Sequence, residues 1–380
     1  MTAYDPTPYR AEAPIVSERV YLDHAALAPL PLRSQEAARA VLAEQAGRGA
    51  PVFPEWLERV EETRARAARL LNAEAGEVVM VTNTAAGLSL VADALPWNPG
   101  DAVLVSTPDF PSLVYPFAAL VRRGVRCVSI PRGPGGRLGV ADVERALRSE
   151  PRTRLVAISS VDYSSGFLAD LEAIGALCRE RGLRFAVDAI QSLGAVPHDV
   201  RAIACDFLCA GGHKWLLAPA GAGLLFVSRV TWSVLSQPNG GWKSVVDPFD
   251  FSLHFERLRP DATRLEPGTP NFAGIAALGA SLDLLLEADP ARVHAHLLDL
   301  TSRLADGLRE RGHEVVSPWG DGERSGILTT TATGDPDALA ARLAERWVSC
   351  SVRQGRLRLS PHLWNSVEDV ARFFSAFDGD

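Results

Sequence analysis

Short apolar runs recur along the first two thirds of the chain and alternate with segments of helical periodicity. Runs without polar interruption are typical of strands that are covered on both faces of a sheet. Helical patterns, such as those over residues 143–147 and 171–178, lie between them. This alternation predicts βαβ units and a mainly parallel sheet. The predicted strands cover residues 78–81, 102–105, 127–130, 155–158, 185–187 and 207–209.

The pattern changes after about residue 229. A loop rich in proline, glycine and tryptophan covers residues 237–250 and is long enough to suggest a functional segment. Helices are expected over 272–286, from 290 to 311, after Asp335-Pro336 and after Asn365, with strands near 315–316, at 327–331 and as a pair within 348–359. We therefore expect an N-terminal arm at 1–20, a large domain at 21–289 and a small α+β domain at 290–380.

Composition narrows the class of protein. With 47% apolar and 22% charged residues, the 380-residue chain resembles other globular proteins, and its length suggests two domains. A net charge of −7 without a dense Lys/Arg tract disfavours nucleic acid and membrane partners. No apolar run reaches the roughly 18 residues of a membrane span. The N-terminus lacks a signal-peptide pattern and the five cysteines lack metal-ligand spacing, so we expect a cytoplasmic protein without a bound metal.

Two residues carry the strongest chemical signal. Asp188 follows the predicted strand at 185–187, and Lys214 follows the one at 207–209. Parallel strands end at the same edge of a sheet, where ligands bind, so this amine and this carboxylate are expected to meet there. The pair suits pyridoxal 5′-phosphate (PLP), whose aldehyde forms a Schiff base with a lysine while an aspartate keeps the pyridine nitrogen protonated. Taken alone, the two residues also fit a surface lysine and a paired core aspartate.

Several motifs, in order, resemble the class V aminotransferase family of fold type I PLP enzymes, which includes cysteine desulfurases, kynureninases and isopenicillin N epimerase. The motifs begin with YLDHAA at residues 21–26 and continue through the segments around Asp188 and Lys214. The sequences EPGTPN at 266–271 and RLSPHLWN at 358–365 complete the set, and the resemblance covers about residues 21–377. It implies an α/β fold with a mainly parallel seven-stranded sheet, helices on both faces, and PLP as the cofactor.

The resemblance also assigns cofactor contacts to single residues. Lys214 matches the Schiff-base lysine, which also moves the α-proton of the substrate. Thr84 and Ala85 lie at a strand-to-helix turn whose amides could receive the phosphate, and His213 matches a phosphate-contacting histidine. Phe110 falls where the family stacks a ring on the pyridine, and Gln191 falls near the ring hydroxyl. The expected cofactor contacts are Thr84, Ala85, Phe110, Asp188, Gln191, His213, Lys214 and Thr269.

Other residues are expected to contact the substrate. Arg358 matches the arginine that binds the substrate carboxylate with its guanidinium fork, although Arg353 and Arg356 compete for this role. His24 and Tyr163 complete the expected substrate contacts. Thr269 matches a residue that binds the phosphate of the neighbouring subunit, which implies a homodimer with shared active sites.

Three departures from the family separate this chain from cysteine desulfurases. Those enzymes carry a loop with a nucleophilic cysteine before the substrate arginine, whereas only residues 354–357 separate Arg353 from Arg358. Cys350 lies in a strand-like run and is interpreted as a packed thiol. Phe110 replaces the imidazole that desulfurases stack on the ring, and Tyr163 stands where many members have an asparagine.

Amino transfer from a small amino acid or amine to a 2-oxo acid is therefore the first functional hypothesis. Carbon–sulfur or other β-elimination, or a desulfurase-like or kynureninase-like cleavage, is the alternative on the same residues. A catalytically silent binding module is the alternative of a different class. Retention of Asp188, Gln191, His213 and Lys214 together argues against a silent module, because a site without catalysis has no physical need for that set.

Overall fold

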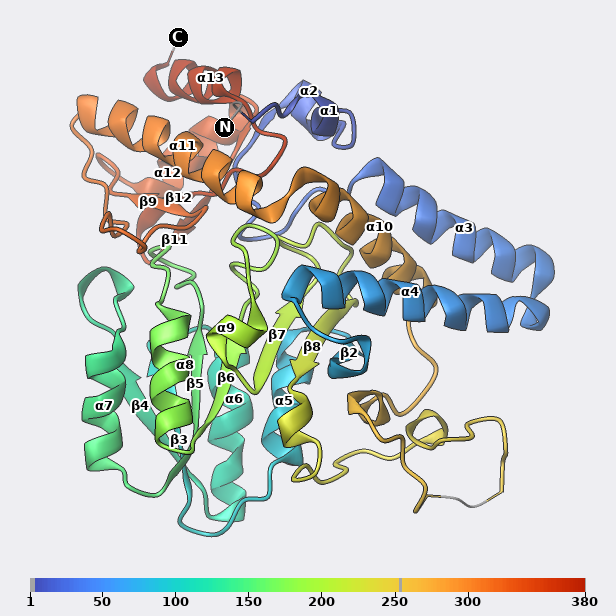
Figure 1. Ribbon diagram of the computed structural model, residues 1–380. Helices are drawn as coiled ribbons and strands as arrows, with labels where there is room; N and C mark the ends of the chain where they lie inside the picture. Colours follow the sequence, from blue (N-terminus) through green and yellow to red (C-terminus); the bar gives the residue numbers. More distant parts are fainter. Residues whose placement is uncertain (1–3, 253–254, 380) are drawn as a thin grey trace.

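A seven-stranded sheet forms the centre of the molecule, with the strand order β2-β8-β7-β6-β5-β3-β4 (Figure 1). The structure is a computed structural model that describes residues 4–252 and 255–379. All neighbouring strands are parallel except β8, which is antiparallel to both β2 and β7. The strands are β2 (Val78–Val81), β3 (Ala102–Thr107), β4 (Arg126–Pro131), β5 (Thr153–Ser159), β6 (Arg184–Asp188), β7 (Phe207–Gly211) and β8 (Gly223–Val227). The predicted sheet is confirmed, and β8 is the one strand whose position was not predicted.

Helices cover both faces of this sheet, as predicted (Figure 1). Side chains alternate along a strand, so β5 directs Val156 and Ile158 to one face and Leu155 and Ala157 to the other. The first face packs against α4 (Phe53–Leu71), α7 (Val140–Ser149), α8 (Leu171–Glu180), α9 (Val200–Ile203) and α10 (Phe272–Ala288). The second face packs against α5 (Thr84–Ala94) and α6 (Pro111–Ala118). A central strand such as β5 is continuously apolar because its two faces pack into two separate cores.

Side-chain caps fix where several of these helices begin. Asn83 accepts a hydrogen bond from the Ala86 amide at the start of α5, and Asp170 and Asn271 cap α8 and α10 in the same way. Helix α3 (Leu32–Arg48) packs beside α10. Among the residues that the structure describes, no helix is both long and apolar enough to cross a bilayer.

The C-terminal elements form a smaller layer beside the large sheet. Helices α11 (Pro290–Glu310), α12 (Pro336–Glu345) and α13 (Val367–Asp378) surround a sheet with the order β11-β12-β9. Its strands are β9 (Leu328–Thr330), β11 (Ser351–Arg353) and β12 (Arg356–Leu359). The predicted pair at 348–359 thus contains a third short strand, β10 (Val348–Ser349), which pairs in parallel with β1 (Val20–Tyr21). Before β1, the chain forms the short helices α1 (Thr7–Arg10) and α2 (Ile15–Glu18).

The prediction of a strand near residues 315–316 is wrong. Only a single bridge, between Val315 and Thr330, forms there. Pro318 follows two residues later and has no amide hydrogen, so a longer ladder could not continue through it. Residues 237–250 form a loop, as predicted, with a 3₁₀ turn at Trp242–Ser244.

Candidate active site

A cavity of about 290 Å³ lies at the carboxyl edge of the sheet, where the sequence predicted a ligand site. The ends of β6 and β7, the start of α5 and the loops after β3 and β5 all contribute to it. It brings together Thr84, Ala85, Phe110, Tyr163, Gln191, His213, Lys214 and Arg358 from the predicted set, with Ala25, Ala26, Asn83, Ser112, Ile190 and Arg353. A site of this size suits a small organic ligand.

Lys214 is almost buried in this cavity, with 8% of its surface exposed. Burial and, next, the nearby guanidinium of Arg358 lower the pKa of the Lys214 amine to about 8. An amine with such a pKa is partly neutral near pH 7, so it can act as a nucleophile and as a base. Its Nζ atom lies 5.5 Å from the centre of the Phe110 ring.

Asp188 is the last residue of β6 and is 2% exposed. Burial raises the pKa of Asp188 to about 7, and the charge of Asp109 acts in the same direction. The Ile190 amide, 3.0 Å from Oδ1, and the charge of Lys214 act to lower that pKa. Asp188 does not itself line the cavity. A ligand that placed a cationic ring nitrogen beside it would stabilise the charged carboxylate.

The start of α5 has the features expected of a phosphate site. Amides in the first turn of a helix lack intrahelical acceptors, and the positive end of the helix dipole attracts an anion. Thr84 and Ala85 occupy this turn, and the Thr84 hydroxyl accepts a hydrogen bond of 2.9 Å from the Gly211 amide. That hydroxyl keeps its own hydrogen for a ligand. Burial and then the charge of Lys214 lower the pKa of His213, which favours its neutral form.

Two arginines, Arg353 and Arg358, also line the cavity. The Nη1 of Arg358 donates to the Tyr163 carbonyl at 2.9 Å, and its Nη2 lies 3.4 Å from Oδ1 of Asp23. Burial lowers the pKa of Arg358 to about 10, so the group is still charged at neutral pH. The Nε of Arg358 has no hydrogen-bond partner among the described residues. Arg353 also lines the cavity. Both arginines therefore remain candidates for binding the carboxylate of a substrate.

Besides Asp188, two predicted contacts, His24 and Thr269, do not line this cavity. His24 was expected to contact substrate, but its side chain is completely buried, and Nδ1 contacts the Ser360 carbonyl at 2.9 Å. Its ring packs among Trp215, His362 and Trp364, so His24 supports the core instead. Thr269 is exposed and does not line the cavity of its own chain. Its predicted contact with a neighbouring subunit stays a prediction.

The Gln191 side chain makes two hydrogen bonds within the protein. Its amide nitrogen donates to the Ala25 carbonyl at 3.1 Å, and its oxygen accepts from the Trp215 indole at 3.0 Å. The second hydrogen of the amide nitrogen is the one that could reach a ring hydroxyl.

None of the five cysteines lines the cavity. Burial, followed by the charge of Asp23, raises the pKa of the Cys350 thiol to about 12, so this group is not a thiolate at neutral pH. Cys350 packs against the apolar cluster of the C-terminal layer. Its interpretation as a packed thiol agrees with this position.

Comparison with known proteins identifies the family. The profile described as Aminotransferase class-V matches residues 20–373. The chain belongs to the class V aminotransferase family. A curated relative from Methanothermobacter thermautotrophicus, a probable cysteine desulfurase, is 31% identical over 95% of this chain and 94% of its own length. This family uses PLP, so the predicted cofactor is confirmed.

Two solved structures show the same fold. The apo structure of a cysteine desulfurase from Thermococcus onnurineus has a TM-score of 0.89 at 24% identity and covers 99% of this chain and 98% of that chain. The cystine C–S lyase C-DES, in complex with its reaction product cysteine persulfide, has a TM-score of 0.88 at 21% identity and covers 96% and 99%. The predicted fold type I architecture is thereby confirmed.

The residues present fit PLP. The α5 N-terminus with Thr84 and His213 suits its phosphate, and the buried carboxylate of Asp188 suits a protonated ring nitrogen. The Lys214 amine suits its aldehyde. Phe110, which is 43% exposed, offers an aromatic ring at the cavity.

Proposed function

We propose that this class V enzyme cleaves the carbon–sulfur bond of a small sulfur amino acid by β-elimination, without a protein thiol as sulfur acceptor. The observation that carries this proposal is that Lys214, Thr84 and His213, which suit PLP, line a cavity that no cysteine lines. The relatives are named as a probable cysteine desulfurase and a cystine C–S lyase, which suggests the substrate class. The β11–β12 turn leaves no room for a mobile cysteine loop, because Arg353 directly pairs with Arg356 across it.

We assign a different step of the reaction to each of several residues at the cavity. Bound PLP supplies an electron sink that makes the α-proton of the amino acid acidic. Arg358, or Arg353 beside it, would hold the substrate carboxylate and so direct the Cα–H bond. The Lys214 amine, with its lowered pKa, would accept that proton. Asp188 would keep its negative charge opposite the ring nitrogen.

The reaction balances without an added oxidant or reductant. The Cα–H bond breaks, its electron pair forms a Cα–Cβ double bond, and the Cβ–S bond breaks with its pair leaving on sulfur. Water then converts the three-carbon fragment to pyruvate and ammonia. Lys214 in its protonated state and the Tyr163 hydroxyl are two cavity groups that can donate a proton to the leaving sulfur.

Amino transfer is the second candidate, because it needs the same residues and no leaving-group acid. Phe110 occupies the position that offers a proton donor in desulfurases, which favours a reaction without a leaving group. A 2-oxo acid would then appear with the carbon skeleton of the substrate intact.

A product assay separates these reactions. The PLP-loaded protein is incubated with L-cysteine or L-cystine, and pyruvate, ammonia, sulfide or persulfide, alanine and 3-mercaptopyruvate are measured. We expect pyruvate and ammonia in equal amounts with the released sulfur species. Alanine as the main product would identify a desulfurase, and mercaptopyruvate that depends on an added 2-oxo acid would identify an aminotransferase. Either result would overturn the proposal.

Two variants complete this assay. Lys214→Ala is expected to lose turnover and the visible absorption of the bound cofactor, because no other amine lies in the cavity among the described residues. Cys350→Ala is expected to keep at least about half of the activity, since its buried thiol is not a thiolate. Loss of sulfur release in Cys350→Ala with a normal fold would restore the desulfurase hypothesis.

A further inference from the structure

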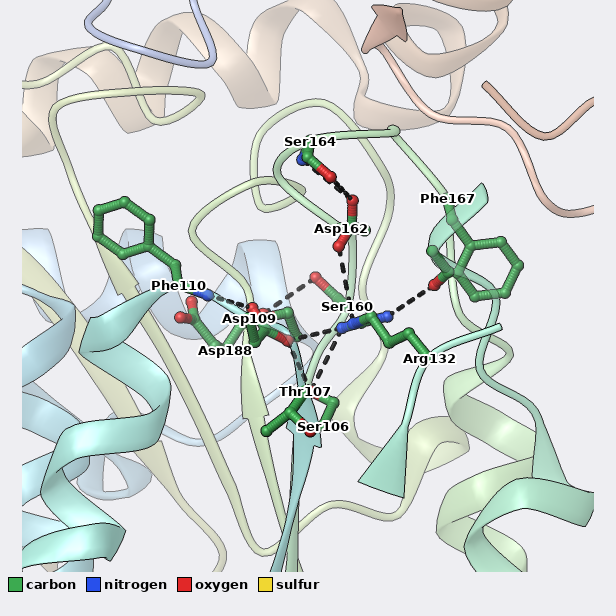
Figure 2. Close-up of polar contacts among 12 residues, drawn as sticks. Ser106, Thr107, Asp109, Phe110, Arg132, Ser160, Asp162, Ser164, Phe167 and Asp188 are labelled. Carbon is green, nitrogen blue, oxygen red and sulfur yellow. Dashed lines mark hydrogen bonds and ion pairs between the residues drawn. The ribbon is translucent and has the colours of Figure 1, made fainter. Parts of the chain in front are cut away.

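Three charged side chains are buried side by side next to the cavity but do not line it (Figure 2). Arg132 directly follows β4, Asp109 follows β3, and Asp162 follows β5. Their side chains are 2%, 1% and 4% exposed, respectively. Buried charges are costly unless they are paired, so their position needs a physical reason.

Asp109 joins Arg132 to the backbone of Phe110. One carboxylate oxygen accepts from Arg132 Nη2 at 2.7 Å and from the Ser106 hydroxyl at 2.6 Å. The other accepts from the Ser159 hydroxyl and from the Phe110 amide, both at 2.7 Å. The carboxylate therefore fixes the peptide that carries the Phe110 side chain.

Asp162 organises the loop that carries Tyr163. Its Oδ1 accepts from the amide and hydroxyl groups of Ser164 and Ser165 at 2.7 to 3.0 Å. Its Oδ2 lies 3.6 Å from Arg132 Nε. The Tyr163 ring meets the Phe110 ring edge to face, with centres 5.5 Å apart. One guanidinium thus contacts the bases of both loops whose aromatic rings meet at the cavity.

Arg132 is held rigidly enough to serve as this link. Its amide donates to the Thr107 carbonyl at 2.8 Å, and its Nη1 donates to the Gly136 carbonyl at 3.0 Å. The first contact is to the last residue of β3, and the second is to the 3₁₀ turn at Pro134–Gly136 that follows β4. The guanidinium has a planar fork, so it can contact two carboxylates from fixed directions.

We propose that Arg132 is a positioning residue that fixes the Phe110 ring, braced by Tyr163, against bound PLP by holding Asp109 and Asp162 at the bases of their loops. This inference rests on the PLP site of the proposed function and not on the reaction that follows. Arg132 touches neither cofactor nor substrate, and it acts through Phe110.

A double-mutant cycle on cofactor affinity tests this role. The Kd of the cofactor-free protein for PLP is measured by fluorescence titration for the wild type, Arg132→Met, Phe110→Ala and the double variant. An aromatic contact is worth about a two- to tenfold change in Kd, so we expect each single variant to weaken binding by that factor. We expect the double variant to bind no more weakly than Phe110→Ala, because Arg132 has nothing left to position.

Two results would overturn the proposal. In the first, Arg132→Met binds PLP as the wild type does. In the second, the two single effects multiply in the double variant, which would show that Arg132 acts independently of Phe110. The visible circular dichroism of bound PLP gives a second readout, and we expect Arg132→Met and Phe110→Ala to change it in the same direction.

Controls separate positioning from folding and from the reaction. Arg137→Met removes a neighbouring arginine whose partner, Glu323, is at the surface, and it is expected to leave the Kd unchanged. If Arg132→Met does not fold, the neutral triple variant Arg132→Met/Asp109→Asn/Asp162→Asn avoids unpaired buried carboxylates, and the same cycle is run on it. An unexpected product in the cysteine assay overturns the proposed function alone, whereas a wild type that takes up no PLP overturns both.

Discussion

The protein environment changes the pKa of the Asp188 side chain before any ligand binds. A carboxyl group ordinarily has a pKa near 3.8, and burial raises that of Asp188 to about 7. The folded protein therefore binds this proton more tightly than the unfolded chain between about pH 4 and 7. Over that interval, the Asp188 contribution makes the free energy of unfolding fall as pH rises, in total by up to about 4 kcal/mol.

The variant Asp188→Asn tests this linkage in the cofactor-free protein. An amide does not titrate, so the variant is expected to lose less stability than the wild type between pH 5 and pH 8. Urea unfolding at both pH values measures the difference. With PLP and substrate present, we expect the same variant to keep the cofactor but to lose about 10²-fold or more in kcat, because an amide cannot hold the ring nitrogen protonated. Equal pH dependence in both proteins would mean that Asp188 is already ionised at pH 5.

At the scale of single elements, two helical glycines give opposite predictions for the same substitution. Gly175 lies in α8 where an added Cβ would be 1.8 Å from the Ile203 carbonyl oxygen. Gly47 lies in α3 with no atom within 4 Å of its added Cβ. The gain in helix propensity is about 1 kcal/mol at most, whereas overpacking against backbone costs about 1–3 kcal/mol. We expect Gly175→Ala to lower the free energy of unfolding and Gly47→Ala to raise it.

Denaturant unfolding of both variants checks this pair. Both variants add the same methyl group within a helix, so the difference between their free energies of unfolding reports the local packing at each site. A stabilised Gly175→Ala variant would show that α8 and the Ile203 segment can move apart without loss.

The elements also show what sequence patterns can and cannot specify. Five of the six predicted strands of the large sheet were predictable because they are largely buried and lack polar interruptions. The sixth, β4, is an edge strand that is mostly exposed and contains Ser129. Residues 223–227 are equally apolar but follow a stretch rich in alanine, proline and glycine, and β8 gains its place by antiparallel pairing with both β2 and β7. Pairing partners are set by the whole sheet, which a local pattern does not encode.

The same distinction applies to the site. Asp188 and Lys214 were predictable because the ends of parallel strands meet at one edge. The burial of His24 depends on three rings from distant segments, and the Arg132 contacts come from three different loops. Such arrangements exist only after the chain has folded. The sequence motifs therefore located the cavity. They did not identify the buried polar residues, such as Arg132, that contact the cavity loops without lining the cavity.

At the scale of the whole molecule, Thr269 leads to a prediction about assembly. Its side chain is exposed and away from the cavity of its own chain, so a phosphate contact would need a second subunit. If sites are shared in a two-fold dimer, mixing Thr269→Ala with Lys214→Ala gives heterodimers in which one site carries both changes and the other carries neither. We expect activity to recover to about half of the sites in each heterodimer, measured after subunit exchange.

This complementation needs one preceding measurement. Thr269→Ala alone must weaken PLP binding, since a hydrogen bond to a charged group contributes only about 1.5–3 kcal/mol. No recovery despite proven subunit exchange, or a monomer at assay concentration, would contradict shared sites and leave the cofactor assignment in place.

The pairing of β1 with β10 has a consequence for synthesis of the chain. Val20 and Tyr21 pair with Val348 and Ser349, and Arg10 donates to Asp369 at 2.7 Å and to the Trp364 carbonyl at 2.8 Å. Residues 10–21 thus leave the ribosome long before residues 348–369, which are their partners. Until then, the apolar side chain of Val20, which is 2% exposed in the folded protein, has no cover from them. Trimming the chain at either terminus would remove the same set of contacts.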